Sequence, residues 1–333
     1  MRVLLVWIAA AFLVFSGPAL AQEVVRAPTP AWVSPLPKEA VPASDGAPVR
    51  ILSVDRQIRI DAEGEHTYTE TRYRIQTAAG LPMANTINGG WNPSRQTLEV
   101  HKIHIIRDGQ VIDVLDGQSF QTLRRERNLE SAMLDGVLTA TLQPRDLRVG
   151  DIIETAFTLH DNGGVLAPHQ ETLDSISPGA AVGRYRVRAS WPADRPIRFR
   201  LSEPWQAVQP RRTRDGYEIE IDERGLAPLR MPSDLPDRYL ITRILQMTDL
   251  TDWAAISTMM APLYQKAEQL EPDSPLNAEI ARIKAANPTI EGQIAAVVRL
   301  VQDDVRYLAL AMGEGGYVPA TADETWRSRY GDC

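Results

Sequence analysis

The chain has 333 residues, of which 44% are hydrophobic and 24% are charged, and its formal net charge is −7 with a pI near 5.4. This length suffices for about two domains, and the composition is that of a globular protein. The acidic balance argues against nucleic acid as a partner, because nucleic-acid binding requires a basic surface. The single cysteine, Cys333, excludes an internal disulfide.

Residues 1–21 have the layout of a secretory signal peptide. One arginine precedes an apolar stretch from Val3 to Phe15, and small residues follow up to Ala21. We expect cleavage after Ala21 and a periplasmic or secreted protein. The alternative is an uncleaved anchor, but this stretch is shorter than the roughly 20 residues that span a bilayer. We expect no further membrane span in the later residues.

Residues 22–48 form a predicted proline-rich linker. Six prolines favour extended polyproline geometry here, namely Pro28, Pro30, Pro35, Pro37, Pro42 and Pro48. The segment is therefore interpreted as a spacer. Its one large apolar pair, Trp32-Val33, could instead dock on a neighbouring domain.

Residues 49–231 show the two-residue hydrophobic period of β-strands. The stretch "HTYTETRYRI", from His66 to Ile75, alternates in this way. The stretch "HKIHIIRDGQVIDV" predicts a hairpin that turns at Asp108-Gly109, because both turn positions require a positive φ. A three-residue spacing on a strand places His101 and His104 on opposite faces, which argues against a metal pair. Many short alternating strands predict an antiparallel sandwich-like or open-barrel domain.

Charged side chains on the last of these strands allow two interpretations. The arginines and carboxylates in question are Arg184, Arg186, Arg188, Arg198, Arg200, Glu218, Glu220 and Asp222. One interpretation is a basic patch for an anionic cell-wall polymer or a lipid surface. The other, which we favour, is cross-strand charge pairing on a solvated face.

Residues 245–333 change to a helical period near Thr251. Ser274 and Pro275 form a typical helix start. A later helix carries an apolar stripe at the spacing of a core-facing helix, consisting of Ile290, Ile294, Val297, Val298, Val301 and Val305. An extended segment, a loop rich in Gly and Pro, and the tripeptide Gly331-Asp332-Cys333 follow.

The order "VRYLAL … GEGGYVPATADETWRSRYGDC" resembles the first part of the bacterial transglutaminase-like family of papain-like cysteine enzymes. The preceding segment, with "PAWV" and "LRVGDIIE", is similar to a domain of unknown function that commonly precedes such domains in secreted bacterial proteins. Together the resemblances cover roughly residues 31–333. They imply an α+β chain, in which an antiparallel β-sandwich-like domain is followed by the first, mainly helical part of a transglutaminase-like domain.

In that family the Gly-Asp-Cys motif places the nucleophile, here Cys333, at the start of the central helix. Unpaired N–H groups at a helix start lower the pKa of a thiol and can hold an oxyanion. Gly331 would allow close approach there, and Asp332 is expected to act as a cap or turn acceptor. The base and its orienting residue lie downstream in the family, and no upstream histidine matches them. We therefore expect that the sequence is truncated at the nucleophile.

These observations predict an exported cysteine acyl-transfer enzyme that acts on amide bonds through a thioester at Cys333. It could be a peptidase, an amidase or a protein cross-linking enzyme, with a protein or cell-wall peptide as substrate. No metal, cofactor or nucleic acid is expected, and the oligomeric state is not predicted. The alternative is a non-enzymatic envelope binding or scaffold protein, in which the β-rich domain is the working part.

Overall fold

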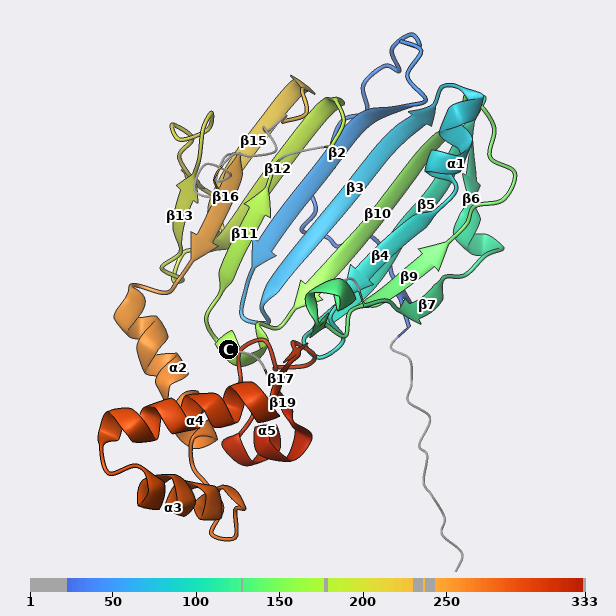
Figure 1. Ribbon diagram of the computed structural model, residues 1–333. Coiled ribbons are helices and arrows are strands. Elements are labelled where there is room, and N and C mark those ends of the chain that lie inside the picture. The colour runs from blue at the N-terminus through green and yellow to red at the C-terminus, as the bar shows by residue number, and fades with distance from the viewer. Residues whose placement is uncertain (1–22, 127, 177–178, 230–235, 237–242, 332–333) are drawn as a thin grey trace, which may run out of the picture.

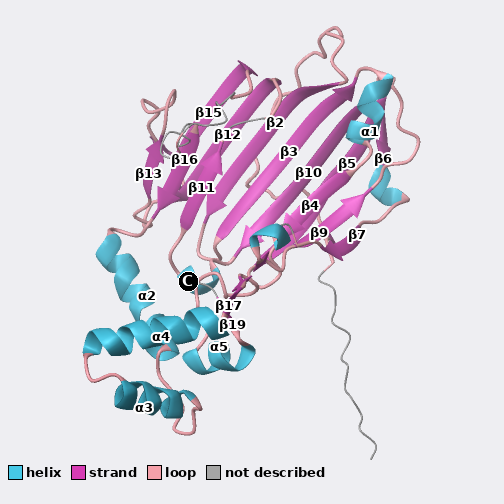
Figure 2. Ribbon diagram, in the orientation of Figure 1, coloured by secondary structure: helices cyan, strands magenta, loops and turns pink. Residues whose placement is uncertain are grey.

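The computed structural model describes residues 23–126, 128–176, 179–229, 236 and 243–331. A β-rich part, which ends at residue 248, is followed by a mainly helical part (Figure 1). Figure 2 shows that most of the helices lie together below one end of the sheets. This arrangement confirms the predicted α+β class and the β-rich character of the first part.

Nine strands form one large sheet in the order β1-β5-β10-β3-β2-β12-β15-β14, with β6 also paired to β5. They are β1 (Val25–Arg26), β2 (Val49–Ile60), β3 (Glu65–Ile75), β5 (Gln96–Arg107), β6 (Gln110–Asp113), β10 (Ile152–Asp161), β12 (Val182–Pro192), β14 (Arg211–Arg212) and β15 (Gly216–Leu226). Most pairs are antiparallel, but β1 with β5 and β12 with β2 are parallel. The expectation of a purely antiparallel domain is wrong at these pairs. β11, the strand directly before β12, belongs to a second sheet. The chain therefore returns to the large sheet from outside it, and β12 can lie parallel to β2.

Two three-stranded sheets, β4-β9-β7 and β11-β16-β13, pack on the large sheet and bury a hydrophobic core at each end. Their strands are β4 (Ile87–Trp91), β7 (Gln121–Arg124), β9 (Leu138–Leu142), β11 (Glu171–Ser175), β13 (Arg198–Leu201) and β16 (Ile244–Thr248). One core clusters Ile58 of the large sheet with Leu245 of β16. The other clusters Ile153 with Leu142 of β9.

The hairpin at Asp108-Gly109 is confirmed, because both residues have a positive φ, 50° and 79°. The placement of His101 and His104 on opposite faces is wrong. The register between β5 and β10 shifts beside Ala156, where His101 is an extra residue of β5. This bulge restores both histidines to one face, where His101 hydrogen-bonds Thr158 and His104 lies beside Glu154.

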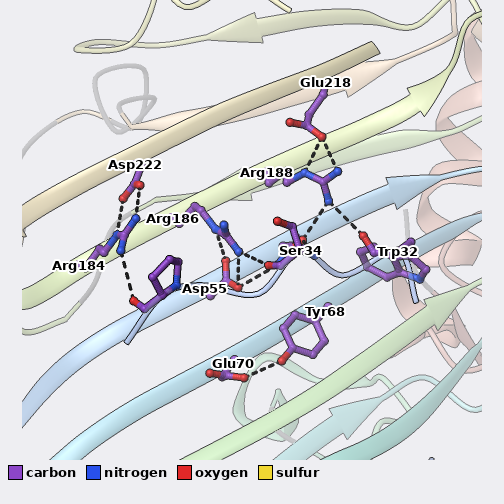
Figure 3. Close-up of polar contacts among 12 residues, drawn as sticks. Trp32, Ser34, Asp55, Tyr68, Glu70, Arg184, Arg186, Arg188, Glu218 and Asp222 are labelled. Atoms are coloured by element: carbon purple, nitrogen blue, oxygen red, sulfur yellow. Dashed lines mark hydrogen bonds and ion pairs between the residues drawn. The ribbon is translucent and has the colours of Figure 1, made fainter. Parts of the chain in front are cut away.

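The face of the large sheet opposite the small sheets carries rows of charged side chains, and we call it the polar face. On β12, Arg184 pairs with Asp222 and Arg188 pairs with Glu218 across to β15 (Figure 3). Cross-strand pairing is therefore confirmed for Arg184 and Arg188. It is wrong for Arg198 and Arg200, which lie on β13 in another sheet. The expected solvation is wrong for the middle of the row, because Arg186 is only 5% exposed.

Residues 31–42, which we call the strap, cover the middle of the polar face. The Ser34 carbonyl accepts from Gln57 at 2.8 Å and from Arg186, and the Trp32 carbonyl accepts from Arg188 at 3.2 Å (Figure 3). Lys38 forms an ion pair with Glu154 at 2.9 Å. The segment expected as a spacer is thus held on the sheet by backbone and side-chain contacts.

The remaining elements connect the sheets or build the helical part. They are α1 (Leu81–Ala84), α2 (Trp253–Ala267), α3 (Leu276–Ala286), α4 (Ile290–Asp304), α5 (Ala322–Ser328), β8 (Met133–Leu134), β17 (Arg306–Tyr307), β18 (Ala309–Leu310), β19 (Tyr330–Gly331), and the 3₁₀ turns η1 (Ala78–Gly80), η2 (Val114–Asp116), η3 (Leu129–Ser131) and η4 (Gly164–Leu166). Among the described helices, none is long and apolar enough to cross a membrane. The predicted signal peptide, at residues 1–21, lies outside the described residues.

The apolar stripe of α4 is present at the predicted spacing but is exposed to solvent. Ile290 is 70% exposed, Ile294 is 58% exposed and Val301 is 48% exposed. The expectation of a core-facing helix is therefore not met within the described residues. An apolar face of this kind typically marks a surface that another element or protein covers.

Candidate functional site

The predicted nucleophile, Cys333, and its neighbour Asp332 lie outside the described residues, whose last member is Gly331. The strand that leads to them is well positioned. β19 pairs in parallel with β17, and the Leu308 amide donates to the Gly331 carbonyl at 2.9 Å. The approach to the tripeptide Gly331-Asp332-Cys333 is therefore fixed beside the strand that follows α4.

The turn from α5 into β19 follows from local sequence. A capping box starts α5, in which the Thr321 hydroxyl accepts from the Glu324 amide at 3.1 Å and the Glu324 carboxylate accepts from the Thr321 amide at 3.0 Å. Arg329 ends the helix with a φ of 63°, and its guanidinium lies 3.5 Å from the Trp326 ring centroid. The left-handed residue reverses the chain so that β19 runs back towards β17.

A cleft of about 560 Å³ adjoins this turn. It is lined by Leu308, Leu310, Glu314, Gly315, Val318, Pro319, Ala320, Glu324, Arg327, Ser328, Tyr330 and Gly331. Gly315 is required on its wall, because a Cβ there would lie 2.0 Å from the Leu310 carbonyl oxygen. The lining is mostly apolar with a few charged groups, which is typical of a cleft that holds part of an organic ligand.

A loop of the β-rich part contacts β18, a strand on the wall of this cleft. Residues 128–137, which we call the docking loop, place β8 in parallel beside β18, and the Ala309 amide donates to the Ala132 carbonyl at 2.8 Å. The Glu126 carboxylate holds the loop by accepting from the Asp135 and Gly136 amides, at 2.8 and 3.2 Å. Sequence analysis missed this contact. Asp-Gly is a typical turn dipeptide, so the Asp135-Gly136 pair was a signal that could have been used, but nothing local indicates that Met133 pairs with Ala309, 176 residues later.

Asp323 at the first turn of α5 ties the cleft to the helices before it. Its carboxylate accepts from the Glu271 amide at 2.9 Å and from the Ser274 hydroxyl. These hydrogen bonds, the one from the Glu271 amide first, lower the pKa of Asp323 below its ordinary value. Ser274 also accepts from the Leu276 amide at 3.2 Å, so the predicted helix-start residue has a second role.

The five histidines all lie in the β-rich part, and none lines the cleft. His66 and His160 are joined by their Nδ1 atoms at 2.6 Å, and His169 lies 3.3 Å from Asp249. Burial is the main cause that lowers the pKa of His101. The structure therefore brings none of the five histidines to the lining of the cleft.

Within the described ranges, one group of side chains has metal-ligand spacing. Ligand atoms of Asp61, Glu63 and His66 lie within 4.8 Å of one another. Asp61 already accepts from the His66 ring at 2.9 Å, from the Glu63 amide at 2.9 Å and from Arg59 at 3.1 Å. Hydrogen bonds within the hairpin between β2 and β3 therefore explain why these three side chains lie close together.

A comparison with protein-family models matches residues 62–229, half of the chain, to the family described as Domain of Unknown Function with solved-structure structure (DUF3857). The matched residues lie inside the β-rich domain predicted at 49–231. The match ends before α2 and includes no part of the cleft. A search of curated proteins found no match to this sequence.

Among solved structures, the chain is similar to "a putative protease" from Parabacteroides distasonis ATCC 8503, with a TM-score of 0.64 at 15% identity. The likeness covers 86% of this chain and therefore extends beyond the matched domain, and the chain spans 56% of that protein's length. A yeast LTA4 hydrolase bound to bestatin matches with a TM-score of 0.32 at 11% identity, over 62% of this chain and 31% of that one. Only the first likeness supports a shared fold.

Proposed function

This chain belongs to the DUF3857 family, and from that premise we propose that it is an exported cysteine acyl-transfer enzyme with Cys333 as its nucleophile. The proposed second domain, residues 245–333, is the first part of a transglutaminase-like domain. Its substrates would be amide bonds of proteins or of cell-wall peptides. Hydrolysis of these bonds is favoured over cross-linking by the fold shared with the Parabacteroides distasonis protein, which is described as "a putative protease".

The observation that carries the proposal is the cleft beside β19. Its lining ends at Gly331, two residues before Cys333, and its walls come from the strand after α4 and the Gly- and Pro-containing loop. The resemblance of "VRYLAL … RYGDC" to transglutaminase-like enzymes implies that the nucleophile follows directly after this segment. A cleft next to that position is where an enzyme of this kind would bind its substrate.

In the proposed reaction the Cys333 thiolate attacks the amide carbonyl and forms a tetrahedral oxyanion. Collapse of the oxyanion breaks the C–N bond, the leaving amine takes a proton, and a thioester remains on Cys333. Water then attacks the thioester, which yields the acid and regenerates the thiolate. A cross-linking enzyme would use an amine in place of water. The base that moves these protons would come from residues other than the described histidines.

Export is the second part of the proposal. The pattern of residues 1–21 supports cleavage after Ala21 and a periplasmic or secreted location. Mass spectrometry of exported protein would show a mature chain that begins at Gln22. Retention of the apolar stretch would show that it is an anchor.

The alternative function is a non-enzymatic envelope binding or scaffold protein. The observation that favours it is a charged cavity on the polar face, remote in sequence from Cys333 and lined partly by the strap. In that case the cleft would only pack against neighbouring structure, and Cys333 would have no chemical role.

The test compares amide hydrolysis by the protein at its natural length with that by the Cys333→Ser variant. Enzymes of this type lose on the order of 10³-fold or more in rate when the nucleophile is removed. Ser257→Ala, on the exposed side of α2 and outside the lining of the cleft, is the matched control and should keep most of the activity. A Cys333→Ser variant with unchanged hydrolysis would leave the scaffold function as the better account.

A further inference from the structure

A second cavity lies between the strap and the polar face, and it has no contact with the cleft. Its volume is about 230 Å³. It is lined by Leu36, Pro37, Lys38, Glu39, Ala40, Pro42, Arg50, Leu52, Ser53, Glu70, Arg72, Gly183 and Arg184. The size suits a small ionised group, since a cavity of roughly 150 Å³ already accommodates benzene.

Arg72 is the distinctive residue of this cavity. Its side chain is 9% exposed, and among the described residues its guanidinium donates no hydrogen bond. Its Nε lies 3.1 Å from Glu154 Oε1, but the geometry is that of an ion pair and not of a hydrogen bond. A buried guanidinium N–H that has lost water without gaining a hydrogen-bond acceptor is costly, and this is the case for Arg72 Nε.

The neighbouring arginines on the polar face do not share this feature. Arg186 makes a forked pair with Asp55 at 2.8 and 2.9 Å, and Arg184 makes one with Asp222 at 2.8 and 2.6 Å (Figure 3). Forked contacts of this kind satisfy the planar geometry of a guanidinium. Arg72 has the same type of side chain on the same face but lacks such an acceptor among the described residues.

The carboxylates near Arg72 are already engaged by other groups. Glu70 accepts from the Tyr68 hydroxyl at 2.8 Å and from Lys102 at 2.7 Å. Glu154 is paired with Lys38 at 2.9 Å, and Lys102 lies 3.9 Å from it. Lys38, Arg72 and Lys102 thus share these two carboxylates, which leaves one positive charge of the three without a counterpart. The other charged groups of the lining have partners of their own, because Arg184 pairs with Glu39 and Asp222, and Arg50 pairs with Asp45.

We propose that this cavity is a binding site for a small anion, a carboxylate or phosphate group, held by a forked contact from Arg72 and by the Lys38 ammonium. The anion would supply both the missing negative charge and the missing acceptors. The strap forms the cover of the site, so a bound anion would also link residues 36–42 to β3. This site is independent of the role of Cys333.

The test titrates the 333-residue protein with inorganic phosphate and, separately, with acetate. Each titration is compared with chloride at equal ionic strength. Calorimetry gives the affinity, and the thermal midpoint should rise with either anion if it binds the folded state. Arg72→Gln should weaken binding about tenfold or more, the value of lost hydrogen bonds to a charged group. The stronger of the two anions identifies the ligand as a phosphate or a carboxylate.

Two further variants keep the test decisive. Lys38→Ala removes a side chain that is 54% exposed, so it should fold normally and still weaken binding several-fold. Arg200→Gln, on the exposed side of β13, removes an arginine away from the cavity and should change nothing. The proposal is overturned if neither anion binds better than chloride, or if Lys38→Ala and any folded Arg72→Gln bind as tightly as the unaltered protein.

Discussion

Glu154 shows how a single buried carboxylate organises the polar face. It is 2% exposed, and Lys38, Arg72, Lys102 and His104 all lie around it. Burial raises the pKa of Glu154, but the hydrogen bond from Lys38 and the charges of Lys102 and Arg72 outweigh it, so the pKa is lowered from 4.5. The charged form therefore contributes stability above the unfolded-state pKa, and this contribution is lost as the pH falls through the folded-state value.

We predict that Glu154→Gln lowers the free energy of unfolding by about 3 kcal/mol at pH 7, because it leaves buried cations without their counter-charge. The difference between the two proteins should shrink as the pH falls below 4.5, because the unfolded carboxylate takes up a proton first, and it should vanish once the pH has passed the lower native pKa. Urea denaturation across this range measures both effects. Glu220→Gln, on the exposed side of β15, is the control, and an equal loss in both variants would contradict the account.

At the residue scale, sequence alone identified the alternation of the arginines but not their environment. The period of β12 placed Arg184, Arg186 and Arg188 on one face, which is confirmed. It could not show that the strap covers that face, because a proline-rich segment carries no periodic signal for its binding surface. The bulge at His101 was hidden for a similar reason, since one inserted residue reverses the strand pattern without any distinctive side chain.

At the element scale, the pairing of β8 with β18 connects the β-rich part to the cleft. Gly136 in the docking loop has a φ of 67°, and a Cβ on it would lie 2.9 Å from Met312 Cγ. Arg124 also contacts the Met312 sulfur. The loop therefore fits closely against the segment that follows β18, and a small added group should disturb the fit.

We predict that Gly136→Ala separates β8 from β18 and speeds hydrogen exchange of the Ala309 amide about tenfold or more, because that amide donates to Ala132. Exchange measured by mass spectrometry reports this directly. Gly109→Ala is a matched control, because Gly109 also has a positive φ, 79°, but nothing lies within 4 Å of its Cβ position. If the Ala309 amide exchanged at the same rate in both variants, contact of the added methyl group with Met312 would not be what separates β8 from β18, and this prediction would be wrong.

The strands of the large sheet illustrate what local pattern can and cannot predict. The alternating stretches gave β3, β5, β12 and β15 as strands, and the Asp108-Gly109 turn gave the β5–β6 hairpin. The parallel pairing of β2 with β12 joins segments about 130 residues apart. No local feature encodes such a pairing, since it depends on how the intervening sheets pack.

At the scale of the whole molecule, the β-rich part extends beyond the predicted limits of 49 and 231. Leu245 and Met247 of β16 are fully buried in its core, and β16 is the middle strand of the sheet β11-β16-β13. At the other end, β1 pairs with β5 and the strap covers the polar face. The cooperative unit should therefore run from about residue 23 to about residue 250.

We predict that a chain of residues 23–250 unfolds in one cooperative transition, and that residues 49–231 alone are several kcal/mol less stable, since each lost core side chain costs about 2–5 kcal/mol. Far-UV circular dichroism with a urea titration compares the two. If the shorter chain were as stable as the longer one, β16 and the strap would contribute nothing to the stability of the β-rich part.

The helical part bears on the proposal that Cys333 is a nucleophile, because α5, β19 and the cleft lead directly to this residue in the sequence. The exposed stripe of α4 is an apolar surface of the kind that another element or protein typically covers. The sequence pattern predicted helices, an extended segment and a loop before Gly331-Asp332-Cys333, but it did not predict α5 or β19. None of the histidines lies on the lining of the cleft.

The most direct test is the pH dependence of iodoacetamide alkylation at Cys333 in the folded protein at its natural length, read residue by residue by mass spectrometry. The same protein unfolded in urea is the reference and should show an ordinary thiol pKa of roughly 8.5. If Cys333 is the nucleophile at a helix start, its pKa in the folded protein should be lower by about one unit or more. A folded-state pKa equal to or above the unfolded reference would contradict the account.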